Sequence, residues 1–154
     1  MLSPMSESKD FFADVSPILT TKLVIASEAA EARRIQDRIE QELRVHLFDA
    51  HEIFSIKLAL EEALVNSIKH GNQMDRSKSV RIAYRVTSER FDVMISDQGI
   101  GFDPGDVPDP TAAENLERPC GRGLMLMRHY MTEVWYNQGG NAVYMNKVRG
   151  NSKK

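Results

Sequence analysis

The sequence lacks a second cysteine, so Cys120 can form no disulfide within the chain. It also lacks an apolar run long enough for a signal peptide or a membrane span, and we therefore expect a cytoplasmic protein without membrane contact. An excess of charge of one sign is missing too, since 20 Lys and Arg against 22 Asp and Glu leave a net charge of -2. This balance gives no electrostatic reason to expect nucleic acid as a partner.

Signatures of two large phosphate-handling classes are also absent. The chain has no glycine-rich P-loop followed by Lys-Ser or Lys-Thr, and it has no catalytic-loop or metal-binding signature of ordinary protein kinases. Its four histidines show no metal-ligand spacing with the single cysteine, so a zinc site is not expected.

The length of 154 residues fits one domain with a single hydrophobic core. Residues 1–19 mix Ser, Pro, Lys and Asp with few apolar side chains, which predicts a disordered arm. We expect the folded domain over residues 20–149 and a short tail over residues 150–154.

Three helices are expected. Residues 28–47 are rich in Ala, Glu, Arg and Gln, and Ser27 can cap them. A second helix is predicted from the N-cap Asp49 to His70, with Gly71 as the residue that ends it. Its apolar residues recur at spacings of three and four: Ile53, Ile56, Leu60, Leu64 and Ile68. A short third helix is expected over residues 124–131, with the methionines at 125, 127 and 131 in the core.

Five strands are expected over residues 20–26, 80–86, 91–96, 132–137 and 142–148, where β-branched or alternating apolar residues predominate. The last two are joined by Gln-Gly-Gly-Asn, which is a strong hairpin signal. With so many hairpins, the sheet must be mixed and largely antiparallel. We therefore predict a two-layer α/β sandwich whose helices cover one face of the sheet, and a doubly wound fold is disfavoured.

Glu62, Asn66 and His70 form the first candidate constellation. Their spacing of four places them on one stripe of the second helix, away from the apolar stripe. A carboxylate and an amide oxygen one turn apart suit Mg²⁺, and the carboxylate can also act as a general base. The alternative is an ordinary solvated face of the helix.

Two glycine-rich strings form the other candidates. Asp97 ends a strand before Gly99 and Gly101, so its carboxylate could accept a hydrogen bond from an exocyclic amine while the glycines admit a planar ligand. Residues 121–124 (Gly-Arg-Gly-Leu) run from a long loop into a helix, whose free N–H groups could bind phosphate beside Arg122. A plain turn and a glycine hinge are the respective alternatives.

Taken in order, the strings EEALVNSIKHGN, DQGIGFDP, GRGLMLMRHYMTEV and GGNAVYMNK resemble the GHKL superfamily of ATP-binding domains with the Bergerat-type fold. Within it, the chain is most similar to the anti-sigma-factor serine kinases. The resemblance covers about residues 22–147.

The resemblance implies a role for each matching position. Asn66 looks like the Mg²⁺-binding asparagine, Glu62 like the catalytic carboxylate, and Asp97 like the residue that recognises adenine. Gly99 and Gly101 match the glycines beneath the base. The phosphate-facing end of the ATP lid is matched by Gly121, Gly123, Leu124 and Arg122, which is the catalytic arginine. The first motif ends with His70 and Gly71, and Asn141 stands where the family commonly has threonine.

The implied activity is ATP-dependent phosphorylation, with Mg²⁺, of a serine or threonine on an anti-sigma-factor antagonist of the STAS type. The alternative is a regulatory module that binds ATP and sequesters a sigma factor or another partner without phosphoryl transfer. The presence of both Glu62 and Asn66 favours the kinase, and ATP hydrolysis by water ranks lowest. A homodimer is expected from the resemblance alone.

Overall fold

The structure is a computed structural model that describes residues 16–99, 119–137 and 139–150 of the chain. The helical elements are η1 (Ser16–Ile18), α2 (Ala29–Val45), α3 (Ala50–Val65), the π-helical turn η2 (Asn66–Gly71) and α4 (Pro119–Tyr130). The strands are β1 (Thr21–Ala26), β2 (Ser79–Val86), β3 (Arg90–Ser96), β4 (Glu133–Tyr136) and β5 (Ala142–Val148).

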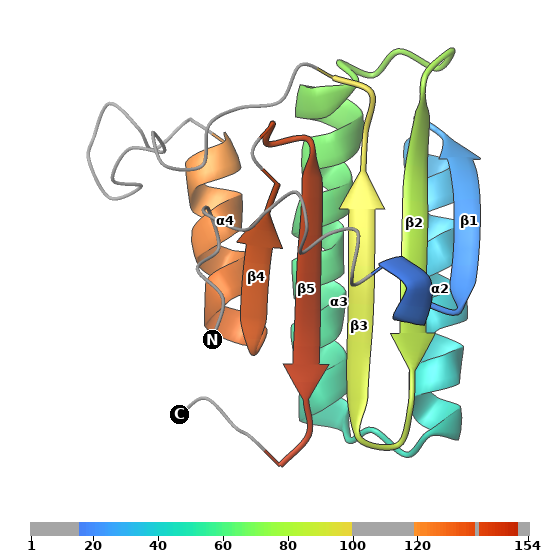
Figure 1. The fold of residues 1–154 in the computed structure, drawn as a ribbon, viewed down its shortest axis with the longest axis vertical. Helices are drawn as coiled ribbons and strands as arrows, with labels where there is room; N and C mark the ends of the chain where they lie inside the picture. Colours follow the sequence, from blue (N-terminus) through green and yellow to red (C-terminus); the bar gives the residue numbers. More distant parts are fainter. Residues whose placement is uncertain (1–15, 100–118, 138, 151–154) are drawn as a thin grey trace.

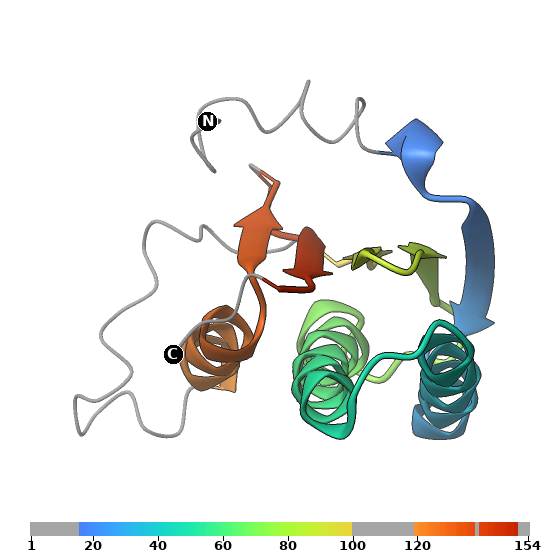
Figure 2. The same ribbon diagram turned by 90° about the horizontal axis from the view of Figure 1, so that it is seen from below.

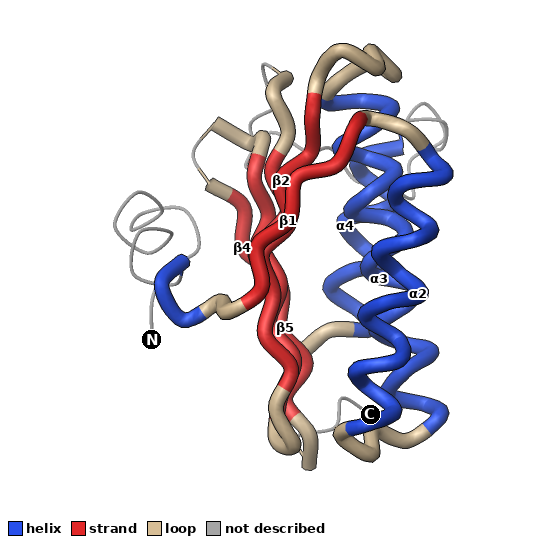
Figure 3. The backbone as a smooth tube through the Cα atoms, turned by 90° about the vertical axis from the view of Figure 1, so that its right-hand side faces the viewer, coloured by secondary structure: helices blue, strands red, loops and turns tan. Residues whose placement is uncertain are grey.

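The five strands form one sheet in the order β1-β2-β3-β5-β4. All four pairings among the described strands are antiparallel, so the parallel component that a mixed sheet would contain is not found there. Helices α2, α3 and α4 lie side by side on one face of the sheet (Figures 1 and 2), and the two layers are seen edge-on in Figure 3. The predicted two-layer sandwich is therefore confirmed.

The hydrophobic core fills the space between the helices and the sheet. Along each strand, every second side chain points into this core, as expected when only one face of the sheet is covered by helices. Burial of each large apolar side chain contributes about 1.5–3 kcal/mol. The fully buried members include Ile35, Ile39, Leu43, Ile56, Leu60, Leu64, Ile82, Tyr84, Phe91, Val93 and Ile95.

The opposite face of the sheet carries a smaller cluster and a buried ion network. Leu19, Ala83, Trp135 and Tyr144 pack together there. Asp92 is 0% exposed and is paired with Arg85 and Arg90 at 2.9 and 2.8 Å. These charge-assisted bonds lower the pKa of Asp92 against the opposing effect of burial.

The folded part begins earlier than predicted. Residues 16–19 were expected in the disordered arm, whereas Ser16–Ile18 forms a helical turn and Leu19 is 1% exposed. The reason is that Leu19 has an apolar partner surface on the outer face of the sheet, which a single sequence does not reveal. Residues 1–15 and the tail beyond residue 150 lie outside the described residues.

The helix ends differ from the predicted ones in two respects. Glu28, not Ser27, is the N-cap of α2, and the Ser27 side chain is buried instead. Asp49 caps α3 as predicted and forms a capping box with Glu52. Gly71 does not end the helix in a left-handed conformation; the α-helix ends at Val65, and a π-helical turn follows.

Helix α4 begins at Pro119, five positions before the predicted start. Proline suits the first turn of a helix, because its missing N–H would have no partner there. Gly121 and Gly123 therefore lie inside the helix, not in the loop before it. Met127 is buried as predicted, but Met125 is 49% exposed.

Arg149 ties together the end of the sandwich at which α3 begins. Its guanidinium donates to the carbonyls of His46, Leu47 and Ser88 at 2.8–3.2 Å, pairs with Glu52 at 3.2 Å, and lies 4.6 Å from the centre of the Phe48 ring. None of the helices in the described parts of the chain has the length and apolar character needed to cross a bilayer.

Candidate functional site

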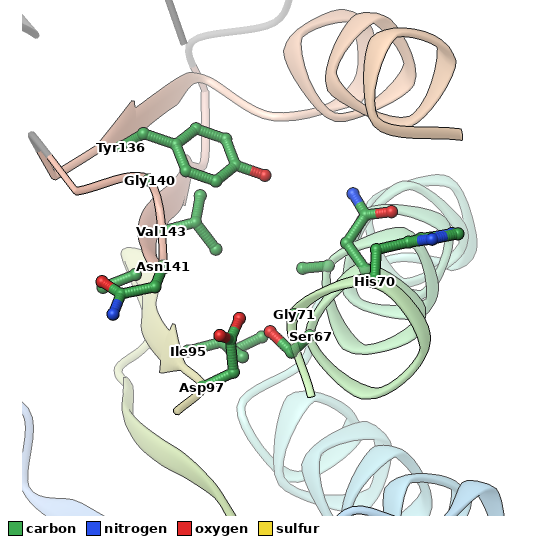
Figure 4. Close-up of a pocket in the computed structure, with 12 residues that line it drawn as sticks. Ser67, His70, Gly71, Ile95, Asp97, Tyr136, Gly140, Asn141 and Val143 are labelled. Atoms are coloured by element: carbon green, nitrogen blue, oxygen red, sulfur yellow. The ribbon is translucent and has the colours of Figure 1, made fainter. Parts of the chain in front are cut away.

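A pocket opens between the C-terminal end of the α3–η2 helix and the sheet, beside the C-terminal ends of β3 and β4 and the start of β5 (Figure 4). Its volume, with the open mouth included, is about 470 Å³. Twelve of the described residues line it: Ala63, Asn66, Ser67, His70, Gly71, Ile95, Asp97, Tyr136, Gly140, Asn141, Ala142 and Val143.

The π-helical turn η2 supplies the helical wall of the pocket. The Asn72 N–H donates to the Ser67 carbonyl at 2.8 Å, a bond that spans five residues where an α-helix spans four. The wider turn rotates the side chains that follow Val65. Asn66, Ser67, His70 and Gly71 consequently all line the same pocket.

Asp97, the first residue after β3, lies at the floor of the pocket with its carboxylate directed into the cavity (Figure 4). Two glycines make this placement possible. A β-carbon on Gly71 would overlap the Asp97 carboxylate, and one on Gly99 would overlap the Gly71 carbonyl. Both positions therefore require glycine because of close approach, not because of an unusual backbone conformation.

Burial raises the pKa of the Asp97 carboxyl above its ordinary value. Three neighbours oppose this effect: the Gly99 N–H, which donates to Asp97 Oδ1 at 2.8 Å, the Ser67 hydroxyl, and the positive charge of Lys78. With Oδ1 already bonded, the carboxylate retains acceptor capacity toward the cavity. An amine on a planar ligand is a group that this floor can recognise.

Glu62 and Asn66 meet helix α4 at Gly123. A β-carbon on Gly123 would lie 2.9 Å from Glu62 Oε1 and 3.1 Å from Asn66 Nδ2, so glycine allows the close contact of α3 and α4 at this point. Asn66 Nδ2 is buried and has no hydrogen-bond partner among the residues that the structure describes. A buried polar group without a partner is costly, and it marks a site that a ligand can complete.

The Glu62 carboxylate and the Asn66 amide oxygen are suitable ligands for a Mg²⁺ ion that is also coordinated by a phosphate group. Mg²⁺ is commonly held by one or two protein oxygens together with substrate phosphates. Among the described residues, no three His, Cys, Asp or Glu side chains gather into a metal-binding cluster. Asn66 would hold the ion through its amide oxygen, with Glu62 beside it.

Gly123, which faces this part of the site, directly follows the first turn of α4. The first N–H groups of a helix have no partner within the helix and favour anions. Within the described part of α4 these groups belong to residues 120 and 121, because Pro119 has no N–H. The predicted phosphate-binding segment is therefore the first turn of the helix itself.

The other predicted site residues have mixed positions. His70 lines the pocket, although its ring is directed away from Asp97 (Figure 4); burial and the nearby Lys69 charge lower its pKa. Asn141 also lines the pocket, but its side chain is engaged by the protein: Oδ1 accepts a hydrogen bond from Asn137 Nδ2, and Nδ2 donates to the Gly99 carbonyl at 3.4 Å. The Leu124 side chain is 4% exposed and packs in the core.

Some predicted positions lie beyond the described parts of the chain, namely Gly101 and the side chain of Arg122. In return, the pocket contains residues that no motif indicated. Ser67 touches Asp97, and Tyr136 and Val143 form an apolar wall opposite the helix. The alternation of β4 and β5 could have placed Tyr136 and Val143 on the helix-facing side, but not beside this helix end.

A sequence profile of the histidine kinase-like ATPase domain matches residues 25–147. The chain is 31% identical over 87 residues to the serine/threonine-protein kinase BtrW of Bordetella bronchiseptica, which covers 55% of this chain and 61% of BtrW. It is 32% identical over 103 residues to the serine-protein kinase RsbW of Bacillus subtilis, which covers 62% of this chain and 64% of RsbW. The chain thus spans just under two thirds of these two relatives.

A solved structure has the same fold. The crystal structure of the RsbU and RsbW domains of a Mycobacterium tuberculosis protein matches with a TM-score of 0.56 and 16% identity. The match covers 84% of this chain and 32% of that one.

Proposed function

The chain belongs to the histidine kinase-like ATPase domain family, and from this premise we propose that it is an ATP-dependent protein serine/threonine kinase. Its proposed substrate is an anti-sigma-factor antagonist of the STAS type. The names of the relatives, which are serine or serine/threonine-protein kinases, support the reaction class. The proposed identity of the substrate protein is based on the resemblance to anti-sigma-factor kinases.

The base of ATP is proposed to bind at the floor of the pocket. Asp97 would accept a hydrogen bond from the exocyclic amine of adenine, and Gly71 and Gly99 leave room for the ring to lie against the backbone. The apolar wall of Ile95, Tyr136 and Val143 suits a flat aromatic ligand. The phosphates then extend toward Asn66 and the first turn of α4.

Glu62 is proposed as the general base for phosphoryl transfer. The serine or threonine oxygen of the partner attacks the γ-phosphorus, the bond from that phosphorus to the bridging oxygen breaks, ADP leaves, and Glu62 takes the hydroxyl proton. Mg²⁺ bound through Asn66 would neutralise phosphate charge. Gly121, Gly123 and Arg122, at the start of α4, are the proposed phosphate contacts.

One observation carries this proposal: Glu62 and Asn66 Nδ2, which has no partner among the described residues, both approach Gly123, the residue directly after the first turn of α4. A carboxylate, an amide oxygen and free helix N–H groups in one place match the needs of a triphosphate whose terminal group is transferred. A solvated helix face would not leave a buried amide without a partner.

The test begins with a calorimetric titration of the full chain with ATP, with and without Mg²⁺. Transfer of labelled γ-phosphate to the STAS-type antagonists of its own genome is then measured for the wild type, Glu62→Gln and Glu61→Gln. Glu61 is a matched control, because it is exposed and accepts a hydrogen bond from Gln36 on α2. We expect ATP binding in all three, with transfer reduced at least about a hundredfold in Glu62→Gln alone.

The alternative outcomes are distinct. Intact transfer by Glu62→Gln would remove this residue from the mechanism. ATP binding without transfer by the wild type, together with capture of a sigma factor, would instead support the sequestering module. Release of phosphate without any partner would indicate hydrolysis. A homodimer, a cytoplasmic location and the absence of nucleic-acid binding stay predictions, and light scattering tests the first.

A further inference from the structure

A closed ring of three hydrogen bonds lies directly behind the pocket. The Gln98 N–H donates to Asn72 Oδ1 at 2.8 Å, and Asn72 Nδ2 donates to the Ser79 carbonyl at 2.9 Å. The Ser79 N–H donates to Gln98 Oε1 at 2.8 Å and closes the ring. Each of the three residues therefore donates once and accepts once within the ring.

The ring joins the two segments that make the floor of the pocket. Asn72 directly follows Gly71, and Gln98 stands between Asp97 and Gly99. None of the three ring residues lines the pocket. They can influence a ligand only through the neighbours that they hold in place.

The ring is anchored in the interior of the domain. Asn72 is 0% exposed, and its Nδ2 also donates to Ser27 Oγ at 3.3 Å, at the turn between β1 and α2. Asparagine suits this place because one short side chain both donates and accepts; aspartate could accept but not donate. Gln98, by contrast, is exposed, so water can replace its side-chain bond without unfolding the protein.

We propose that Asn72, Gln98 and Ser79 are positioning residues that set the base specificity of the nucleotide site. They hold the Asp97 carboxylate against Gly71, in the position where it can accept a hydrogen bond from the exocyclic amine of the base. Hydrogen bonds weaken steeply once distance or angle departs from its optimum, so a small shift of Asp97 reduces recognition. This inference rests on the proposed function, because it requires ATP as the ligand.

The test compares ATP with ITP, which carries a carbonyl oxygen where ATP carries the amine. A well-placed carboxylate accepts from the amine and repels the carbonyl, so the ratio of the two dissociation constants reports the position of Asp97. A loss of general stability does not change this ratio. The ratio is measured by calorimetry for the wild type, Gln98→Met, Asn72→Ala and Gln36→Met.

Gln36→Met is the matched control. Gln36 donates one exposed side-chain hydrogen bond to Glu61 at 2.9 Å, and it lies outside the pocket. The substitution therefore removes the same chemical group as Gln98→Met while leaving the ring intact. Asn72→Ala breaks two bonds of the ring but can impair folding, in which case Gln98→Met decides alone.

We expect the preference for ATP over ITP to fall about two- to tenfold in Gln98→Met, the range of one hydrogen bond, and further in Asn72→Ala. Gln36→Met should keep the wild-type preference. An unchanged preference in Gln98→Met, or an equal loss of affinity for both nucleotides, overturns the inference and leaves the proposed function standing. A wild-type protein that binds neither nucleotide overturns the proposed function itself.

Discussion

The two ends of helix α3 differ in how completely their polar groups are paired. At the N-terminal end, Asp49 and Glu52 form a reciprocal capping box, and Arg149 binds the carbonyls of the preceding turn. At the C-terminal end, the helix widens into a π-helical turn, Asn66 Nδ2 is buried with no partner in the described parts of the chain, and burial raises the pKa of the neighbouring Asp97.

This difference separates stability from function along one helix. The N-terminal end contributes pairing energy that is complete in the protein alone. The C-terminal end retains polar groups whose desolvation is not offset, and such groups cost free energy until a ligand supplies the missing partners. Substitutions at the two ends should therefore have opposite signatures: loss of binding at one, loss of folding stability at the other.

The largest expected effect is that of Gly71→Ala on ATP binding. The added methyl group would overlap the Asp97 carboxylate at the floor of the pocket. We expect a loss of affinity of at least about a hundredfold, since the carboxylate must leave its place. Calorimetry measures the affinity, and Gly139→Ala is the control, because its methyl group would make ordinary van der Waals contacts with Asn141 Oδ1 at 3.6 Å and Asn137 Nδ2 at 4.0 Å. Equal affinities in the two variants would contradict the close packing of Gly71 on Asp97.

Asp97→Asn should weaken ATP binding about ten- to a hundredfold, which is the worth of a charge-assisted hydrogen bond. The same change should raise the melting temperature at neutral pH. Burial raises the pKa of Asp97 in the folded state, so there is a pH range in which the folded protein holds a proton that the unfolded chain releases. The free energy of unfolding therefore falls as the pH rises from the unfolded-state pKa to the folded-state pKa. Asparagine removes that loss.

The pH dependence of binding follows from the same group. ATP affinity in the wild type should decline on acidification as Asp97 becomes protonated, and the decline should begin above the pH expected for an ordinary aspartate. The melting temperature and the affinity of Asp97→Asn, measured together across mildly acidic to neutral pH, check both signs. A variant that loses stability and affinity in parallel would place Asp97 among the structural residues.

The smallest effect on binding is expected at the other end of α3. Arg149→Met keeps the apolar stem but removes the bonds to the His46, Leu47 and Ser88 carbonyls and to Glu52. We expect the free energy of unfolding to fall by about 1–3 kcal/mol, with ATP affinity unchanged. Denaturant unfolding and calorimetry test the two halves, and a weakened ATP affinity would show that the two ends are coupled.

Much of the architecture could be predicted because its causes are local. Alternating apolar residues and the Gln-Gly-Gly-Asn turn are sufficient to indicate the strands, and Asp49 marks the start of α3 through its own side chain. The ordered motifs also indicated Glu62, Asn66 and Asp97, which now lie at a common pocket or beside it.

The details that were missed depend on contacts between distant segments. The π-helical turn is accompanied by bonds from Asn72 to Ser27 and Ser79, which no spacing rule contains. The early start of α4 was missed because Gly121 and Gly123 lower helix propensity, although Pro119 is a readable start signal. Gly123 is instead required by the approach of Glu62, a contact between helices.

Trp135 gives the molecule a built-in optical probe. It is the single tryptophan of the chain, 6% exposed, and it lies on the outer face of β4 opposite Tyr144. Among the described strands, β4 is one of the two edge strands and pairs only with β5, so we expect it to open more readily than the central strands. The next residue, Tyr136, lines the pocket. A ligand bound there would stabilise β4, and the fluorescence emission of the Trp135 indole would report the opening of that strand.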